Sequence, residues 1–308
     1  MNINLEVACL VLAAVVLDWW LGEPRRFHPL VGFGNIANYV QQKCYGNRSE
    51  KAALKKIRGI VAVALLLIPT AVIAIVLSSL PYVGLALSAL MLYFCLGHKS
   101  LHDHALPIMT ALQNNNDKEA RYLAGRMVSR DAGSLDIVTA TTESVLENGN
   151  DAVFGTVLWF VIAGAPGAVL YRLANTLDAM WGYRNERYYN FGWAAARFDD
   201  LLNYIPARLT ALTYAFTGKT QQALFCWRTQ APTWDSPNAG PVMAAGAGAL
   251  GISIGGAACY QGEWHERPVL GTEEKPESRD IERALKLVRH GVWLWIGVLF
   301  VLGGVAYA

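Results

Sequence analysis

The feature that most constrains this chain is the run from Gly59 to Leu80, which contains no charged side chain. A helix needs about 20 consecutive apolar residues to cross the hydrocarbon core of a bilayer. Comparable apolar runs predict further spans, so that the full set is 5–21, 58–80, 82–97 and 291–308. Only 16% of the residues are charged, against about 25% in a typical soluble domain, which also indicates a membrane protein.

Two more apolar segments are less regular. Residues 152–177 are interrupted by Gly164, Ala165, Pro166 and Gly167, and residues 240–260 are rich in Gly and Ala. Irregular backbone at membrane depth is tolerated only where protein buries it or it lines a cavity, so each segment is either re-entrant or spanning. The sequence therefore predicts an all-α, polytopic helical membrane protein with about four or five transmembrane helices, a re-entrant or broken helical segment and cytosolic helical loops.

The basic residues indicate how the chain is oriented. Lys and Arg are concentrated between the first two spans, and Arg283, Lys286 and Arg289 precede the last one. The positive-inside rule places both regions in the cytoplasm. We therefore interpret 1–308 as one integral-membrane domain of the cell inner membrane, whose active-site loops 98–151 and 178–239 face the cytosol.

Charge and cysteine content exclude several other classes. The formal net charge is only +2, so no basic field suggests nucleic-acid binding. The five cysteines form no CxxC pair, which argues against a disulfide framework or a zinc site.

Glu143, Glu147 and Asp151 form the first candidate site. Their i, i+4, i+8 spacing places them near one face of a helix, where like charges repel. Mg²⁺ prefers oxygen ligands of this kind, together with phosphates, and would remove the repulsion. A solvated helix face is the alternative. Nearby, Arg130 is either a phosphate contact or the partner of Asp131.

The second candidate site is the segment 175–208, which mixes charges of both signs with aromatic residues. Arg184, Arg187 and Arg197 offer planar guanidinium groups that suit phosphates. Asp199 and Asn203, at i and i+4, could share a metal ion or a phosphate-bound water. The aromatic residues either line a cleft for a large flat ligand or form an interfacial belt.

Asn238 marks a third candidate site, in the sequence "SPNAG" ahead of a glycine-rich helix. Backbone N–H groups at a helix start can bind an anion, so we predict a contact with a cofactor here. The chain contains no P-loop motif.

Taken in order, these motifs resemble the CobD/CbiB family, the adenosylcobinamide-phosphate synthases. The resemblance covers nearly the whole chain and rests on "LGEPRRFHPLVGFG", "MVSRDAGSLD", "ESVLENGNDA", the block 164–209, "SPNAGPVMAAGAGALG" and "ERPVLG". A more distant resemblance is to the AmpE family of membrane proteins, which lacks the Ser-Pro-Asn-Ala block.

The resemblance implies an ATP-dependent ligase of cobalamin biosynthesis. Such an enzyme joins a carboxyl group of the corrinoid adenosylcobyric acid to the amine of (R)-1-amino-2-propanol O-phosphate. ATP and Mg²⁺ are implied by this reaction, and other membrane enzymes of the pathway are candidate partners. The metal candidates are Glu143, Glu147, Asp151, Asp199 and Asp200.

Roles for the remaining candidates follow from the same chemistry. The catalytic candidates are Asp178, Asp199, Asp200 and Glu147, with Asp178 as the base that takes a proton from the amine. The cofactor-binding candidates are Arg130, Arg184, Arg187, Arg197, Asn203 and Asn238. Three alternatives stay open: a corrinoid transporter, a non-catalytic sensor or scaffold of the AmpE kind, and a CDP-alcohol transferase, whose motif spacing is missing here.

Overall fold

A computed structural model of the chain describes residues 4–24, 27–47, 50–128, 136–260 and 263–305. Twelve α-helices account for most of these residues, and the strands within them are each three residues long. The predicted all-α class is therefore confirmed. The chain divides into two compact units, one made of residues 1–97, 155–203 and 299–308, and the other of residues 98–154 and 204–298.

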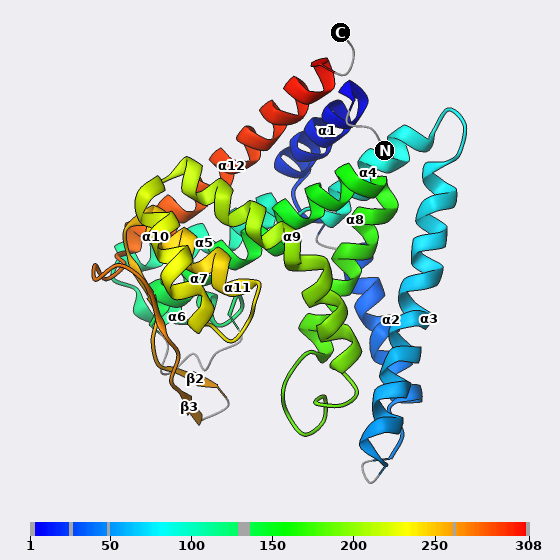
Figure 1. The fold of residues 1–308 in the computed structure, drawn as a ribbon, viewed down its shortest axis with the longest axis horizontal. Helices are drawn as coiled ribbons and strands as arrows, with labels where there is room; N and C mark the ends of the chain where they lie inside the picture. The colour runs from blue at the N-terminus through cyan, green and yellow to red at the C-terminus, as the bar shows by residue number, and fades with distance from the viewer. Residues whose placement is uncertain (1–3, 25–26, 48–49, 129–135, 261–262, 306–308) are drawn as a thin grey trace. The chain divides into compact units, whose positions relative to one another are not determined.

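The first unit is built from long apolar helices. Its elements are α1 (Leu5–Leu21), α2 (Pro29–Cys44), α3 (Ala52–Ser78), α4 (Gly84–Cys95), α8 (Gly155–Trp181) and the beginning of α9 (Trp193–Thr217). Figure 1 shows α2 beside α3, and α3 and α4 both pack against α8. The core between these helices includes Phe33, Leu66, Leu177 and the completely buried Trp181.

Local sequence determines where several of these helices begin and end. The Asn4 side chain accepts a hydrogen bond from the Val7 N–H at the start of α1, and Gly22, with φ of 66°, ends that helix. At α2 the His28 ring accepts from the Leu30 N–H and Pro29 takes the first helical position, where its missing N–H costs nothing.

Among the described residues, four helical stretches are long and apolar enough to cross a membrane: Ala52–Ser78, Gly84–Gln113, Ile137–Trp181 and Ser278–Val305. Large apolar side chains on α3, such as Ile68 and Val76, are more than half exposed. A surface of this kind suits contact with lipid, because water would leave the apolar area unburied. These findings agree with the predicted membrane protein; the number of crossings stays a prediction.

The break predicted at Gly164–Gly167 is present inside α8. Ala163 and Gly164 leave the helical conformation, with φ, ψ of −132°, 17° and 66°, −159°. Only glycine adopts the second of these readily, because a β-carbon would clash with the backbone. Whether the kinked helix dips into a bilayer or crosses it stays a prediction.

The second unit contains shorter helices. They are α5 (His98–Gln113), α6 (Asp117–Ala124), α7 (Ile137–Gly149), the π-helix η2 (Asn150–Phe154), the rest of α9, α10 (Thr220–Gln230), the 3₁₀ turn η3 (Ala231–Thr233), α11 (Ala239–Leu250) and α12 (Ser278–Val305), whose last residues belong to the first unit. Figure 1 shows α10 and α11 side by side, and α11 also packs on α7.

The predicted helical segment 240–260 is not one helix. Its helical part, α11, has 12 residues and ends where Gly251 adopts a left-handed conformation with φ of 71°. The chain then forms β1 (Ser253–Gly255) and β2 (Ala258–Tyr260), which pair antiparallel with β4 (Val269–Gly271) and β3 (Glu263–His265) respectively. The strands were missed because Gly and Ala continue across the boundary without any change in hydrophobic period.

Candidate functional site

In the first unit, Asp199 belongs to a buried hydrogen-bonded chain. The Tyr171 hydroxyl donates to the Asn203 side-chain oxygen at 2.7 Å, and the Asn203 amide donates to Asp199 Oδ2 at 3.0 Å. All three side chains are buried. The i, i+4 spacing of Asp199 and Asn203 thus allows a direct contact between them. Their predicted roles toward a metal ion or a phosphate stay predictions.

Gly155 makes room for this chain. A β-carbon at that position would lie 2.1 Å from the Tyr171 hydroxyl oxygen, well inside van der Waals contact. The start of α8 therefore needs glycine so that Tyr171, on the same helix beyond the kink, can reach Asn203.

The predicted phosphate-binding arginines of the first unit are at its surface. Arg184 and Arg187 are exposed in the segment between α8 and α9. Arg187 lies over the rings of Tyr45 and Tyr188, with its guanidinium 5.7 and 5.4 Å from their centres. Tyr45, the residue that follows α2, contacts the guanidinium with its ring, and its hydroxyl donates to the Arg187 carbonyl at 3.0 Å. The Arg187 side chain is therefore positioned without being buried.

The aromatic residues of this segment fall into two groups. Trp181 and Phe191 are fully buried and meet edge to face with ring centres 5.2 Å apart, so they belong to the core. Tyr183, Tyr189 and Trp193 are exposed. Only this second group fits the predicted cleft or interfacial belt, because Trp181 and Phe191 have no exposed surface.

The first unit contains two further candidate carboxylates, Asp200 and Asp178. Asp200 is half-buried and pairs with the exposed Arg197 at 3.4 Å, three residues away on α9. Asp178 is half-buried on the last turns of α8, directly beside the position that a β-carbon on Gly182 would occupy. Arg197 and Asp200 thus remain accessible, as a ligand-binding pair would need.

In the second unit, Glu143 has a role that the sequence did not predict. Its carboxylate is 2% exposed and accepts hydrogen bonds from both terminal nitrogens of Arg267, at 3.1 and 3.2 Å, and from the Gly255 N–H at 2.7 Å. Arg267 also donates to the Gly256 carbonyl and lies over the Trp234 ring. A two-point arginine–carboxylate pair is a strong, directional contact, and it ties α7 to β1.

The predicted carboxylate triad is therefore not assembled as one ligand set. Glu143 faces Arg267, Glu147 is exposed, and Asp151 lies in the π-helix beside the Asn150 amide, which donates to it at 2.8 Å. The π-helix changes the helical phase after Gly149, which the i, i+4, i+8 argument could not anticipate. Across the described residues, no three His, Cys, Asp or Glu side chains gather as a metal site.

Asn150 and Tyr214 fix this π-helix to α9. The Thr210 hydroxyl donates to the Asn150 oxygen at 2.9 Å, and the Tyr214 hydroxyl donates to the Leu146 carbonyl at 2.8 Å. Burial, followed by the charge of Asp151, raises the pKa of the Tyr214 phenol well above its usual value. The phenol therefore stays protonated and can act as a donor.

Asn238 positions an arginine. Its side-chain oxygen accepts from Arg208 Nη1 at 2.9 Å, while the Pro237 carbonyl accepts from Arg208 Nη2 at 3.0 Å. The Arg208 guanidinium also lies 3.6 Å from the centre of the Tyr204 ring. Arg208 Nη1 also donates to the Tyr204 carbonyl at 2.9 Å. These four contacts hold the guanidinium in a fixed orientation.

Arg208 lines an open cavity of about 460 Å³. Arg228, Trp227, Trp234 and Asp235 also line it. Two arginines and two tryptophans in one cavity suit a ligand that carries both an anionic group and an apolar surface. The block "SPNAG" is recognisable in the sequence. Arg208 and Arg228 have no predicted role, because only tertiary packing brings these two side chains to the same cavity.

The predicted anion contact at the start of α11 stays a prediction, although the turn before the helix already uses some of the N–H groups there. The Ser236 hydroxyl oxygen already accepts from the N–H groups of Asn238 and Ala239, at 3.3 and 3.1 Å, and the Ser236 carbonyl accepts from the Gly240 N–H. The first N–H groups of the helix are therefore used by the turn itself. Arg130, the last predicted contact, lies outside the described residues.

Comparison with known proteins gives the family. The family model described as "CobD/Cbib protein" matches residues 11–288. The chain belongs to the CobD/CbiB family. A CobD/CbiB relative from Stutzerimonas stutzeri, called "Cobalamin biosynthesis protein CobD", is 55% identical over 97% of this chain and 98% of its own length.

Other CobD/CbiB relatives carry the same name. The one from Chromobacterium violaceum is 55% identical over 92% of each chain, and the one from Mycobacterium tuberculosis strain H37Rv is 37% identical over 91% of this chain and 90% of its own. No solved structure matches the chain. The resemblance read from the sequence motifs is thereby confirmed.

Proposed function

We propose that this protein is an adenosylcobinamide-phosphate synthase of cobalamin biosynthesis. It would join adenosylcobyric acid to (R)-1-amino-2-propanol O-phosphate through an amide bond. The observation that carries the proposal is the family match over residues 11–288, together with near full-length relatives named for cobalamin biosynthesis. The apolar helices support an enzyme of the cell inner membrane, with its charged segments on the cytosolic side.

We propose that the cavity around Arg208 receives an anionic group of a substrate. Arg208 is held by Asn238 and Pro237, so its planar donors are oriented before any ligand arrives. Arg228 adds a second positive charge in the same cavity. A phosphate group carries the opposite charge and matches the two-point geometry of a guanidinium group.

Asp199 is our candidate for orienting the amine in the first unit. A carboxylate held by Asn203 and Tyr171 cannot swing freely, and a fixed acceptor can bind an ammonium group and take its proton as the amide forms. Asp178 stays the alternative base, while Arg184, Arg187 and Arg197 stay candidates for phosphate binding.

ATP and Mg²⁺ stay part of the proposal because of the reaction class. ATP would supply activation of the carboxyl group, and Mg²⁺ would neutralise its phosphates. Glu143 does not fit a metal ligand in this structure, because Arg267 and Gly255 already donate to both carboxylate oxygens. Asp199, Asp200, Glu147 and Asp151 remain the metal candidates, and we derive no step through the ion.

The direct test uses membranes from a bacterium that lacks its own synthase. Cells that express the wild-type chain should grow on adenosylcobyric acid, and their membranes should form adenosylcobinamide phosphate, detected by mass spectrometry, when ATP, Mg²⁺ and the amino alcohol phosphate are added. The double variant Asp199→Ala, Asp200→Ala, at equal expression, should give neither. Arg279→Ala is the matched control, because this exposed residue forms an exposed ion pair with Glu277 at 3.0 Å.

Other outcomes point to other classes. If well-inserted wild-type protein forms no product, the synthase proposal fails, and uptake of labelled corrinoid into vesicles would then test the transporter alternative. If both proteins support growth and product formation, the function stands and the assignment to Asp199 and Asp200 is wrong.

A further inference from the structure

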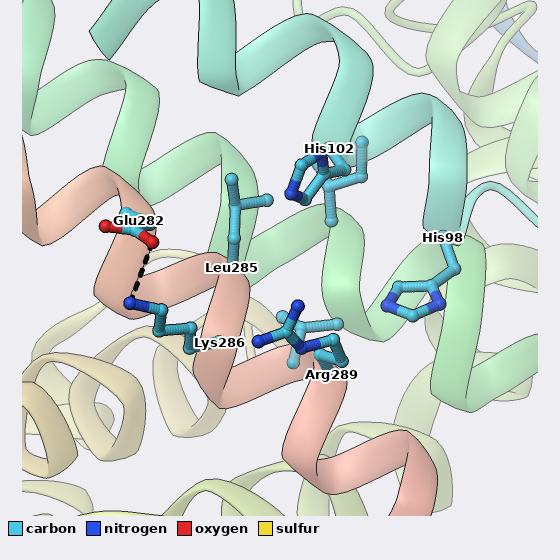
Figure 2. A pocket seen from close by; sticks show the side chains of 8 residues that line it. His98, His102, Glu282, Leu285, Lys286 and Arg289 are labelled. Atoms are coloured by element: carbon cyan, nitrogen blue, oxygen red, sulfur yellow. Dashed lines mark ion pairs between the residues drawn. The ribbon is translucent and has the colours of Figure 1, made fainter. Parts of the chain in front are cut away.

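The second unit contains another polar pocket, which shares no lining residue with the Arg208 cavity. It has a volume of about 30 Å³ and is bordered by residues of α5 and α12. Figure 2 shows His98, His102 and Arg289 around a common space, with Lys286 and Glu282 joined as an ion pair at its edge. Four nitrogen-bearing side chains and one carboxylate in so small a pocket call for an explanation in terms of a ligand.

The charges in the pocket favour an anion with a single negative charge. Lys286 and Glu282 neutralise each other at 2.7 Å. Arg289 contributes one further positive charge, and a neutral histidine ring contributes an N–H donor without adding charge. A phosphodiester carries one negative charge and accepts hydrogen bonds at two free oxygens, so it matches both the charge and the donors.

The position on α12 favours a molecule of the membrane. Arg289 and His290 are the last titratable side chains before Gly291, and no charged residue follows to the end of the chain. The pocket therefore lies at the polar end of the apolar stretch that is long enough to cross a membrane. Basic pockets at such a level are where phospholipid headgroups are bound.

We propose that this pocket binds a phosphate group, and that a membrane phospholipid with an anionic headgroup supplies it. Leu101, Leu285 and Val288 provide the apolar part of the pocket lining, which can contact the glycerol or the first carbons of the acyl chains. A volume of this size accepts one small polar group and excludes a nucleotide or a corrin ring. The pocket is thus too small for the ATP or the corrinoid of the proposed reaction.

The test measures lipid binding to the full-length protein in detergent micelles. Phosphatidylglycerol is titrated in one arm, phosphatidylcholine in a second and inorganic phosphate in a third, with bound lipid counted by native mass spectrometry and the unfolding temperature recorded. Phosphatidylglycerol should bind more tightly than phosphatidylcholine. Arg289→Gln should weaken it by about ten-fold or more, because a charge-assisted hydrogen bond is lost.

Two more variants keep the test decisive. Lys286→Gln is at the exposed edge of the pocket, so folding should survive and binding should weaken even if Arg289→Gln does not fold. Arg279→Gln removes a basic residue of the same helix that does not line the pocket, and it should leave lipid binding unchanged.

The remaining outcomes overturn the proposal or its lipid source. Equal affinity for the two lipids would overturn the preference for an anionic headgroup. An equal loss of binding with Arg279→Gln would show that the protein has no specific site here. Binding of inorganic phosphate with the same dependence on Arg289, without binding of phosphatidylglycerol, would support the phosphate pocket and overturn the membrane lipid as its source.

Discussion

The charged residues around Glu143 differ from those between Arg184 and Asp200. Glu143 and Arg267 are buried and satisfy each other through two hydrogen bonds, with Gly255 taking a third. Arg184, Arg187 and Arg197 are exposed, and the ion pair of Arg197 with Asp200 is long at 3.4 Å. Both regions look alike as sequence, since each mixes charged residues with apolar ones.

This comparison indicates which charged residues are available to bind a ligand. A buried charge must have its partner inside the protein, because removing it from water is costly. The charges of Glu143 and Arg267, which satisfy each other, are therefore committed to the fold. An exposed arginine contributes little to stability and remains able to contact a phosphate. The following predictions test this division.

The largest expected effect is on the buried pair. Glu143→Gln should lower the free energy of unfolding by about 3–5 kcal/mol, because it leaves the Arg267 charge buried without its counterion. The measurement is denaturant unfolding in detergent micelles, with and without Mg²⁺. The matched control is Glu147→Gln on the exposed face of the same helix, which should change stability by less than about 0.5 kcal/mol.

A stable Glu143→Gln protein with weakened Mg²⁺ dependence of activity would contradict this interpretation. Glu143 would then again be a candidate metal ligand. Replacing both Glu143 and Arg267 with Met should recover part of the lost stability, because no unpaired charge then remains buried.

The buried chain at Asp199 should show the next largest effect. Tyr171→Phe removes the hydroxyl that donates to Asn203 and should cost about 1–3 kcal/mol, since a buried acceptor loses its donor. Activity should fall as well, because Asn203 then no longer holds Asp199. Tyr189→Phe, which removes an exposed hydroxyl, serves as the control. Equal stabilities of the two variants would show that the buried Tyr171 hydroxyl contributes no more to stability than the exposed Tyr189 hydroxyl.

Arg197→Ala should have a smaller effect on stability and a distinct effect on function. Its ion pair with Asp200 is largely exposed, so the loss should be below about 1 kcal/mol. If Arg197 contacts a substrate phosphate, KM for the amino alcohol phosphate or for ATP should rise. An unchanged KM for both, measured in the membrane assay, would remove Arg197 from the binding site.

The smallest effect concerns His28, which is buried but titratable. Burial lowers its pKa below 6.5, with Glu23 opposing the shift and Arg172 adding to it. Above pH 6.5 the ring is neutral in both the folded and the unfolded chain. As pH falls below 6.5, the unfolded chain takes up a proton more readily, so stability is lost until the folded pKa is passed.

The measurement for His28 compares unfolding temperatures at pH 7.5 and pH 5.5. His28→Asn keeps a side-chain oxygen that can cap α2 but does not titrate, so it should lose less stability on acidification than the wild type. Equal losses in the two proteins would show that His28 does not contribute to the pH dependence.

Several features of the fold could be predicted because they depend on neighbours in the chain. Apolar runs such as Gly59–Leu80 give helices, and Gly164 with Pro166 gives the kink in α8. The boundary of α11 was missed, because Gly251 looks the same as the helical glycines before it. Only its left-handed conformation, imposed by the turn into β1, ends the helix.

The candidate site was predicted less completely. The segment 175–208 and "SPNAG" were recognised, and Asp199 with Asn203 proved to be in contact. The partner of Glu143 is Arg267, which is far away in sequence, and the partner of Arg208 is Asn238. Spacing along a helix says nothing about such pairs.

Two conclusions follow from the sequence alone: the chain is helical and suited to a membrane, and it belongs to the CobD/CbiB family. Both conclusions rest on hydrophobicity and on motifs, which are properties of short segments. The tertiary structure alone decided that Glu143 is paired with Arg267, that Asn203 holds Asp199, and that Arg208 faces a cavity. The physical reason is that a buried polar group finds its partner through packing, and packing joins residues that are distant in the chain.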